Sequence, residues 1–276
     1  MSTAAARPTP VAASGSAGRA SRALAARLGT VVLTLAIVLA LWHLLTAVTG
    51  IISPARFATP AEVGSALQQI AIDGYSNGRL HEHVLRSVLL VTMGFTVAAS
   101  IGVALGLAMG ASRVVEAFVN PIFLVLRPIP PLAWIPLAIL WLGLGDSAKI
   151  FLIWVAAFTP SVINTYAGVR NIDPTLLEAA RVHGARPGRL MAEVLVPGAL
   201  PMIFTGLRLS LQASWTTLVA AELVGAFTGL GKVLSNAALD INPGMILFAM
   251  VWVGILGAAM TRGLEWLEVK ALPWLK

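Results

Sequence analysis

Residues 178–197 read EAARVHGARPGRLMAEVLVP, a basic stretch that lies between two long apolar runs. The chain around it is 58% hydrophobic and 11% charged, with a mean hydropathy of +0.86. Soluble domains carry about a quarter charged residues, so this composition indicates a polytopic membrane protein. A basic insertion in such a chain predicts a surface that binds a partner outside the bilayer.

Composition also excludes several classes of function. The net charge of +7 does not indicate nucleic-acid binding, because the basic residues lie mostly in loops beside apolar runs, as orientation signals do. The absence of Cys excludes disulfides, haem attachment and zinc–thiolate sites. His81 and His83 lie on different faces of a helix, so a metal pair is not expected. With no catalytic constellation and no phosphate-loop spacing, we expect a non-enzymatic chain that holds no cofactor.

The hydropathy pattern predicts an all-α chain with six transmembrane helices. Residues 1–29 are rich in Ala, Ser, Arg and Pro and contain no acid, which predicts a disordered cytoplasmic tail. A first, uncleaved helix is expected over 30–49. Further spans are predicted at 85–109, 119–142, 148–169, 200–226 and 245–266. The segment 227–244 is too polar and too broken to span.

The distribution of basic residues predicts the orientation of the spans. If the N-terminus is inside, six spans place four regions in the cytoplasm: the tail, the 110–118 loop, the 170–199 insertion and the C-terminus. These regions carry most of the Lys and Arg residues that lie outside the spans. The chain is therefore expected to have both termini in the cytoplasm.

Two features of the second and third spans point to close packing and to a break. Gly102, Gly106 and Gly110 form a ridge that lets helix backbones approach, and packing is its expected role. The third span is interrupted by RPIPPLAW (127–134), in which each proline removes a backbone donor. A break at membrane depth persists only where protein or a water-filled cavity satisfies the freed carbonyls. The segment is thus either a kinked structural helix with a snorkelling Arg127, or the wall or gate of a pathway.

The fifth span is the most polar of the six. Gln212 and Thr216 share one helix face, and Ser210 and Ser214 share another. Hydrogen-bonded packing between helices and lining of a polar path both account for this pattern. Glu222 lies near the outer end and is expected to pair or to meet water. The pathway candidates are Arg127, Pro128, Pro130, Pro131, Trp134, Asn164, Ser210, Gln212, Ser214, Thr216, Thr217 and Glu222.

The insertion itself predicts two short helices. Asp173 and Pro174 form a helix start, and Gly184 is expected to end that helix because glycine takes the left-handed terminus freely. We expect Leu176, Leu177, Ala180 and His183 to share a face, with Glu178 and Arg181 elsewhere. A second helix is predicted over 187–195, before Pro197. The first helix suits a groove on another protein, and lying on the lipid surface is the alternative.

The pattern of Glu178-Ala-Ala180, Gly184 and Pro197 resembles the EAA loop of ABC importer permeases. The family pattern is EAA, three residues, Gly, nine residues, then Ile-x-Leu-Pro; here Val194 and Val196 stand for Ile and Leu. The region 81–264 is similar to the inner-membrane component family of binding-protein-dependent transport systems. This resemblance implies the type I importer fold, with a cytoplasmic coupling helix. The coupling residues it implies are Asp173, Pro174, Leu176, Leu177, Glu178, Ala179, Ala180, Arg181, Gly184, Ala185 and Pro197.

The stretches LRPIPPLAWIPLAILWLGLG (126–145) and WTTLVAAELVGAFTGLG (215–231) are similar to the taurine, aliphatic sulfonate and nitrate permease group. The resemblance implies a permease homodimer in the bacterial inner membrane, two ATPase subunits that bind ATP and Mg, and an extracytoplasmic solute-binding protein. The solute would be a small anion, with sulfonates, nitrate or bicarbonate, and aromatic acids or thiamine precursors all open. A self-sufficient carrier or channel without an ATPase is the alternative.

Overall fold

The computed structural model describes residues 16–53 and 56–275, and no β-strand forms within those ranges. The chain divides into two compact units, Met1–Ala61 and Glu62–Lys276. The expectation of an all-helical chain is confirmed.

The first unit is built on one long helix. Helix α1 (Ser16–His43) continues as a π-helical turn, η2 (Leu44–Val48), and residues 29–48 are apolar enough to cross a membrane. Near its end the indole N–H of Trp42 donates to the carbonyl of Ala58 at 2.9 Å. Helix therefore already covers 16–29, where a disordered tail was predicted, because alanine-rich sequence readily extends an apolar helix that follows it. Residues 1–15 of that tail lie outside the described ranges.

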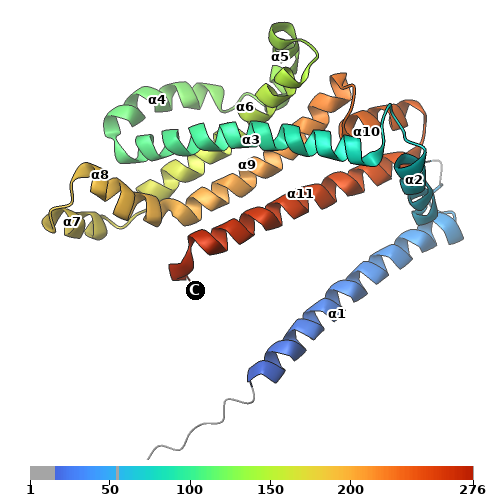
Figure 1. Ribbon diagram of the computed structural model, residues 1–276, viewed down its shortest axis with the longest axis horizontal. Coiled ribbons are helices and arrows are strands. Elements are labelled where there is room, and N and C mark those ends of the chain that lie inside the picture. The colour runs from blue at the N-terminus through green and yellow to red at the C-terminus, as the bar shows by residue number, and fades with distance from the viewer. Residues whose placement is uncertain (1–15, 54–55, 276) are drawn as a thin grey trace, which may run out of the picture. The chain divides into compact units, whose positions relative to one another are not determined.

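The second unit contains the remaining helices (Figure 1). Their bounds are α2 (Pro60–Ile72), α3 (Leu80–Ala111), α4 (Arg113–Leu126), the 3-10 turn η3 (Pro131–Trp134), α5 (Ile135–Leu142), α6 (Asp146–Arg170), α7 (Pro174–Val182), α8 (Pro187–Leu190), the π-helical turn η4 (Met191–Leu195), α9 (Val196–Gly225), α10 (Leu230–Leu239) and α11 (Pro243–Ala271). Helices α3, α6, α9 and α11 are the long ones. Helices α7 and α8 lie at one end of them, and α10 lies at the other (Figure 1).

The number of spans agrees with the sequence. Five helical stretches are long and apolar enough to cross a membrane: 29–48, 80–111, 146–170, 187–225 and 243–271. The predicted third span is instead a broken pair, 113–126 and 131–142, bent by 83°. Prolines at 128, 130 and 131 remove successive backbone donors there, so one straight helix cannot form.

The fifth span also differs from the expectation. A separate helix over 187–195 was predicted, but α8, η4 and α9 form one continuous stretch of 39 residues. Pro197 does not interrupt it, and the residues just before this proline form the π-helical turn η4 instead of a regular α-helical turn. The wide turn is closed by the Val196 N–H, which donates to the carbonyl of Met191.

The glycine ridge of α3 packs against α6, as predicted. A Cβ atom added at Gly102 would lie 2.7 Å from the Cβ of Ser161, and one at Gly106 would lie 2.7 Å from the Cβ of Thr165. Any larger side chain would push the helices apart, so the glycines set the α3–α6 separation. Gly206 of α9 does the same against Asn164 of α6.

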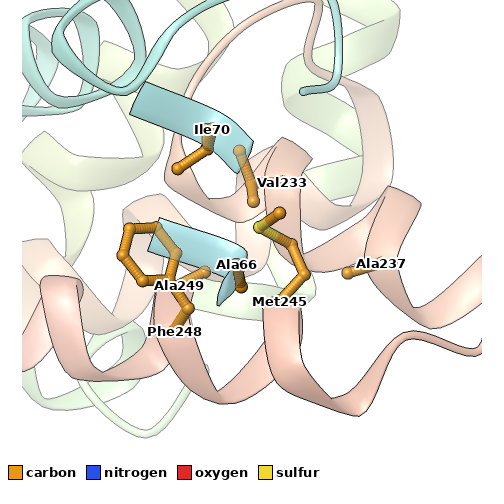
Figure 2. Packing of buried hydrophobic residues seen from close by; sticks show 7 residues of the cluster. All are labelled: Ala66, Ile70, Val233, Ala237, Met245, Phe248 and Ala249. Carbon is orange, nitrogen blue, oxygen red and sulfur yellow. The ribbon is translucent and has the colours of Figure 1, made fainter. Parts of the chain in front are cut away.

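A compact apolar cluster closes the end of the unit that carries α10. Figure 2 shows Ala66 and Ile70 of α2, Val233 and Ala237 of α10, and three residues at the start of α11: Met245, Phe248 and Ala249. All are buried. The short helices α2 and α10 are thus joined to a long helix by burial of apolar surface.

Candidate coupling helix and pathway residues

The ends of α7 are fixed by the residues that the sequence singled out. The Oδ1 atom of Asp173 accepts hydrogen bonds from the backbone N–H of Thr175 at 2.8 Å and from its hydroxyl at 2.7 Å. The bonds from Thr175 hold the pKa of Asp173 below its usual value. At the other end Gly184 adopts φ +78°. The N–H groups of Ala185 and Gly184 donate to the carbonyls of Ala180 and Arg181, which is a Schellman motif.

Only one side of α7 is attached to the rest of the unit. Leu177 packs with Ile172 against a buried cluster made of Val169, Leu195, Ala199 and Ile203. Leu176, which was expected to share that face, is instead 59% exposed. Adjacent residues in a helix point about 100° apart, so a narrow contact cannot bury both leucines.

The free side of α7 combines apolar and charged groups. Val182 is 85% exposed and was not singled out by the sequence, although its apolar side chain between Arg181 and His183 was a signal. Glu178 and Arg181 are exposed, and neither forms an ion pair with any described residue. Helix α7 therefore presents a surface of Leu176, Glu178, Arg181 and Val182 that the second unit does not use.

An ionic contact precedes α7. Arg170, the last residue of α6, forms an ion pair with Glu116 of α4 and lies 5.6 Å from the ring centroid of Tyr166. The Tyr166 hydroxyl also donates to Glu116. The contact joins the end of α6 to α4, three positions before Asp173 begins α7. Its residues were not predicted, since the pairing joins helices far apart in sequence.

The broken span brings three pathway candidates together. Arg127, Pro131 and Trp134 line one cavity of about 360 Å³ beside α6. Pro128 and Pro130 are exposed at the bend and do not line it.

The polar residues of α9 divide into two groups. Gln212 and Thr216 line a cleft of about 480 Å³ between α9 and α11, and Arg208 at its edge pairs with Glu268 at 3.1 Å. Ser210, Ser214 and Thr217 are buried. The Ser210 hydroxyl donates to the carbonyl of Ala157 at 2.7 Å and lies 2.8 Å from the hydroxyl of Ser161. One face of α9 thus borders an open cleft, and the other packs on α6 through hydrogen bonds.

Asn164 lies in the α6–α9 contact rather than beside either space. Its Nδ2 donates to the carbonyl of Pro160 at 2.8 Å, and its Cβ faces Gly206. Its pathway role therefore stays a prediction with no cavity to support it.

Glu222 is fully buried and bound to the start of α10. Its Oε2 accepts from the Gly231 N–H at 2.8 Å, and its Oε1 lies 3.2 Å from the Ser87 hydroxyl. Two residues of α3 bind the neighbouring amides. His83 Nδ1 accepts from Gly229 N–H, and Ser87 Oγ accepts from Leu230 N–H, both at 3.0 Å. Three consecutive donors of a helix start are thereby satisfied by side chains. Glu222 was expected to pair or to meet water, and in the structure it is hydrogen-bonded to groups of the protein.

Comparison with known proteins gives a family and a fold. Residues 100–267 match the family described as binding-protein-dependent transport system inner membrane component. A chain of the MetNI methionine ABC transporter in an inward-facing conformation superposes with a TM-score of 0.56 at 24% identity, covering 68% of this chain and 95% of that chain. This likeness shows that the two chains share a fold.

Three curated permeases cover most of the chain. The taurine transport system permease protein TauC of Escherichia coli (strain K12) is 35% identical, over 87% of this chain and 88% of TauC. The putative aliphatic sulfonates transport permease protein SsuC of Bacillus subtilis (strain 168) is 32% identical, over 87% of this chain and 85% of SsuC. The nitrate import permease protein NrtB of Synechocystis sp. (strain ATCC 27184 / PCC 6803 / Kazusa) is 32% identical, over 87% of both chains.

Proposed function

Because the chain belongs to the binding-protein-dependent transport system inner membrane component family, we propose that it is the permease subunit of an ATP-driven importer for a small anionic solute. It receives the solute from a solute-binding protein and works as a homodimer above two ATPase subunits. ATP and Mg belong to those subunits. This chain supplies the path and the contact that opens it.

The observation that carries the proposal is the exposed side of α7. A nine-residue helix with firm caps, one attached face and a free face of apolar and charged groups suits a groove on another protein. The end of α6, three residues before α7, is joined to α4 by the Arg170–Glu116 ion pair, and α7 itself packs on α9 through Leu177. A displacement of α7 is therefore transmitted to two membrane helices, which is how a rigid-body switch between two states is driven.

The arrangement of basic residues supports the orientation that we propose. The chain lies in the inner membrane with both termini and α7 in the cytoplasm, and with α10 and the cluster around Met245 at the opposite side. Regions at the α7 end carry Arg113, Arg170, Arg181, Arg186 and Arg189, in line with the positive-inside rule.

The names of the relatives and a positive charge within the membrane support a small anion as the solute. TauC and SsuC are named for taurine and aliphatic sulfonates, and NrtB for nitrate, so all three names denote a solute with an anionic group. The cavity beside the broken span contains Arg127 as its charged residue, whereas Arg208 beside the α9–α11 cleft is paired with Glu268. The positive charge of Arg127, unpaired among the described residues, favours passage of an anion at membrane depth.

The test is reconstitution. The chain is placed in liposomes with an ATPase and a binding protein encoded beside it, and uptake of radiolabelled taurine, an alkyl sulfonate and nitrate is measured with and without ATP. We expect uptake of one of these anions only when ATP, the ATPase and the binding protein are all present. Solute movement by the chain alone, at an undiminished rate, would establish a self-sufficient carrier instead.

A further inference from the structure

The cavity beside the broken span has five aromatic residues in its walls. Its volume is about 360 Å³, within the range of small-molecule sites. The ring centroids of Trp154 and Phe158 lie 5.5 Å apart, and those of Trp134 and Phe151 lie 6.3 Å apart. The aromatic residues that line it are Phe123, Trp134, Phe151, Trp154 and Phe158.

One cation stands at this aromatic surface. Arg127 is the only charged residue among those that line the cavity, and it forms no ion pair within residues 16–53 or 56–275. Arg208, which borders the other cleft, differs in that it is paired with Glu268. An exposed guanidinium beside apolar walls is placed to form a charge-assisted hydrogen bond with an anion.

A second donor of the same wall lacks an acceptor. The Nε1–H of Trp154 is buried and has no hydrogen-bond partner among the described residues. Buried polar groups nearly always form hydrogen bonds, so a buried donor without a partner is unusual. The nitrogen atom is enclosed in the wall, so an oxygen atom of a bound molecule becomes its acceptor only when the side chain turns toward the cavity. Thr159 also lines the cavity, and its hydroxyl is a further polar group that can bind the same anionic head.

Resting on the proposed importer function, we propose that this cavity is a solute site within the membrane for an organic anion that has an apolar body, such as an aryl or branched alkyl sulfonate. The anionic head binds Arg127, and the body lies against the rings of Trp134, Phe151 and Trp154. A small hydrated anion such as nitrate cannot use these walls, because it has no apolar surface to bury. Among the anions for which the relatives are named, the cavity therefore favours sulfonates with an apolar body over nitrate.

Binding to the permease alone tests this assignment. The purified chain is placed in nanodiscs of phosphatidylcholine and titrated with naphthalene-2-sulfonate by calorimetry. Arg127→Gln is expected to weaken binding by about tenfold or more, since a charge-assisted bond is lost. Arg127→Lys, which keeps the charge, is expected to retain part of the affinity, and Trp154→Phe to weaken binding by about threefold.

Two matched variants act as controls. Arg113→Gln removes an exposed arginine at the other end of α4, and Trp215→Phe removes an indole N–H that is also buried without a partner but lines the other cleft. Both are expected to bind like the unmodified chain. Unchanged affinity in Arg127→Gln and Trp154→Phe, or an equal loss in the control variants, would overturn the assignment.

Two further arms identify the occupant. Nitrate in excess is expected not to displace the sulfonate, and displacement would show that the apolar body does not matter. Replacing part of the phosphatidylcholine by phosphatidylglycerol is expected to leave the affinity unchanged; a loss would mean that an anionic lipid occupies the cavity, and the solute assignment would be wrong. If the chain does not bind sulfonate but its full complex imports an anion with ATP, only this inference fails.

Discussion

The backbone N–H of Gly231 donates to Oε2 of Glu222 at 2.8 Å, so a carboxylate at the end of one span closes the first turn of the next helix. The bond joins α9 to α10, and the Ser87 hydroxyl of α3 lies beside it. The end of the unit opposite α7 is thus fixed by hydrogen bonds as well as by the apolar cluster of Figure 2.

Replacing Glu222 by Leu is expected to lower the free energy of unfolding by about 1–3 kcal/mol, because the Gly231 N–H is left buried without an acceptor. Glu222→Gln keeps one acceptor oxygen and is expected to cost less. Thermal unfolding in detergent measures both. Glu193→Gln, at an exposed ion pair, is the control and is expected to change little. Equal effects of the Leu and Gln variants would contradict the bond's role.

Gly106→Ala is expected to destabilise the protein by about 1–3 kcal/mol, because the new methyl group would overlap the Cβ of Thr165 on α6. The matched control is Gly263→Ala in α11, where nothing lies within 4 Å of the added atom. There the higher helix propensity of alanine is expected to stabilise by up to about 1 kcal/mol. Opposite signs of the two shifts in unfolding temperature are the expected readout; two shifts of the same sign would refute it.

Glu178→Lys is expected to leave membrane insertion intact and to abolish uptake, because a charge is reversed on the free side of α7. Insertion is measured by the amount of chain in washed membranes, and coupling by copurification of the ATPase. Glu265→Lys reverses a charge at an exposed pair on α11 and is expected to retain uptake. Normal uptake by Glu178→Lys would count heavily against the docking role of α7.

Gly184→Val is expected to impair uptake, since a β-branched residue is strained at φ +78° and the Schellman motif would open. Gly184→Asn should preserve much of the activity because asparagine tolerates the left-handed region. Gly188→Val, at a position with open space and no such backbone conformation, serves as the comparison. If Asn and Val at position 184 behave alike, backbone conformation is not what the position requires.

Burial, and then the hydrogen bond to Asp240, raise the pKa of Tyr75 well above its ordinary 10.0. Because the folded pKa is raised, the contribution of this link to stability is fully present below pH 10 and is lost as the pH rises through the folded pKa. In a Tyr166→Phe background, Tyr75 is the remaining tyrosine. Its tyrosinate absorbance is expected to appear only at higher pH than normal, and Asp240→Asn to bring it back toward the ordinary value. Ionisation of Tyr75 at its ordinary pKa without that substitution would contradict the link.

Local chemistry explains which features the sequence alone determined. The apolar runs fix the number of spans. Prolines 128, 130 and 131 fix the break, because a missing backbone donor disrupts the helix whatever the helix packs against. Asp173 and Gly184 fix the ends of α7, since a cap and a left-handed residue act within one turn. The glycine ridge of α3 predicted close packing for a similar reason, because spacing along one helix defines a face.

Contacts between distant segments decided the rest. Only the tertiary structure places Leu177 inward and Leu176 and Val182 outward on α7, because the direction of a short helix depends on what it rests against. The same holds for α9, where Ser210 packs on α6 while Gln212 borders a cleft, although both belong to equally polar faces. His83 and Gly229, 146 positions apart, meet because two spans fold together. The residue pattern within one helix shows that a face is polar or apolar. Only the neighbouring helices determine whether that face packs on protein or borders a cleft.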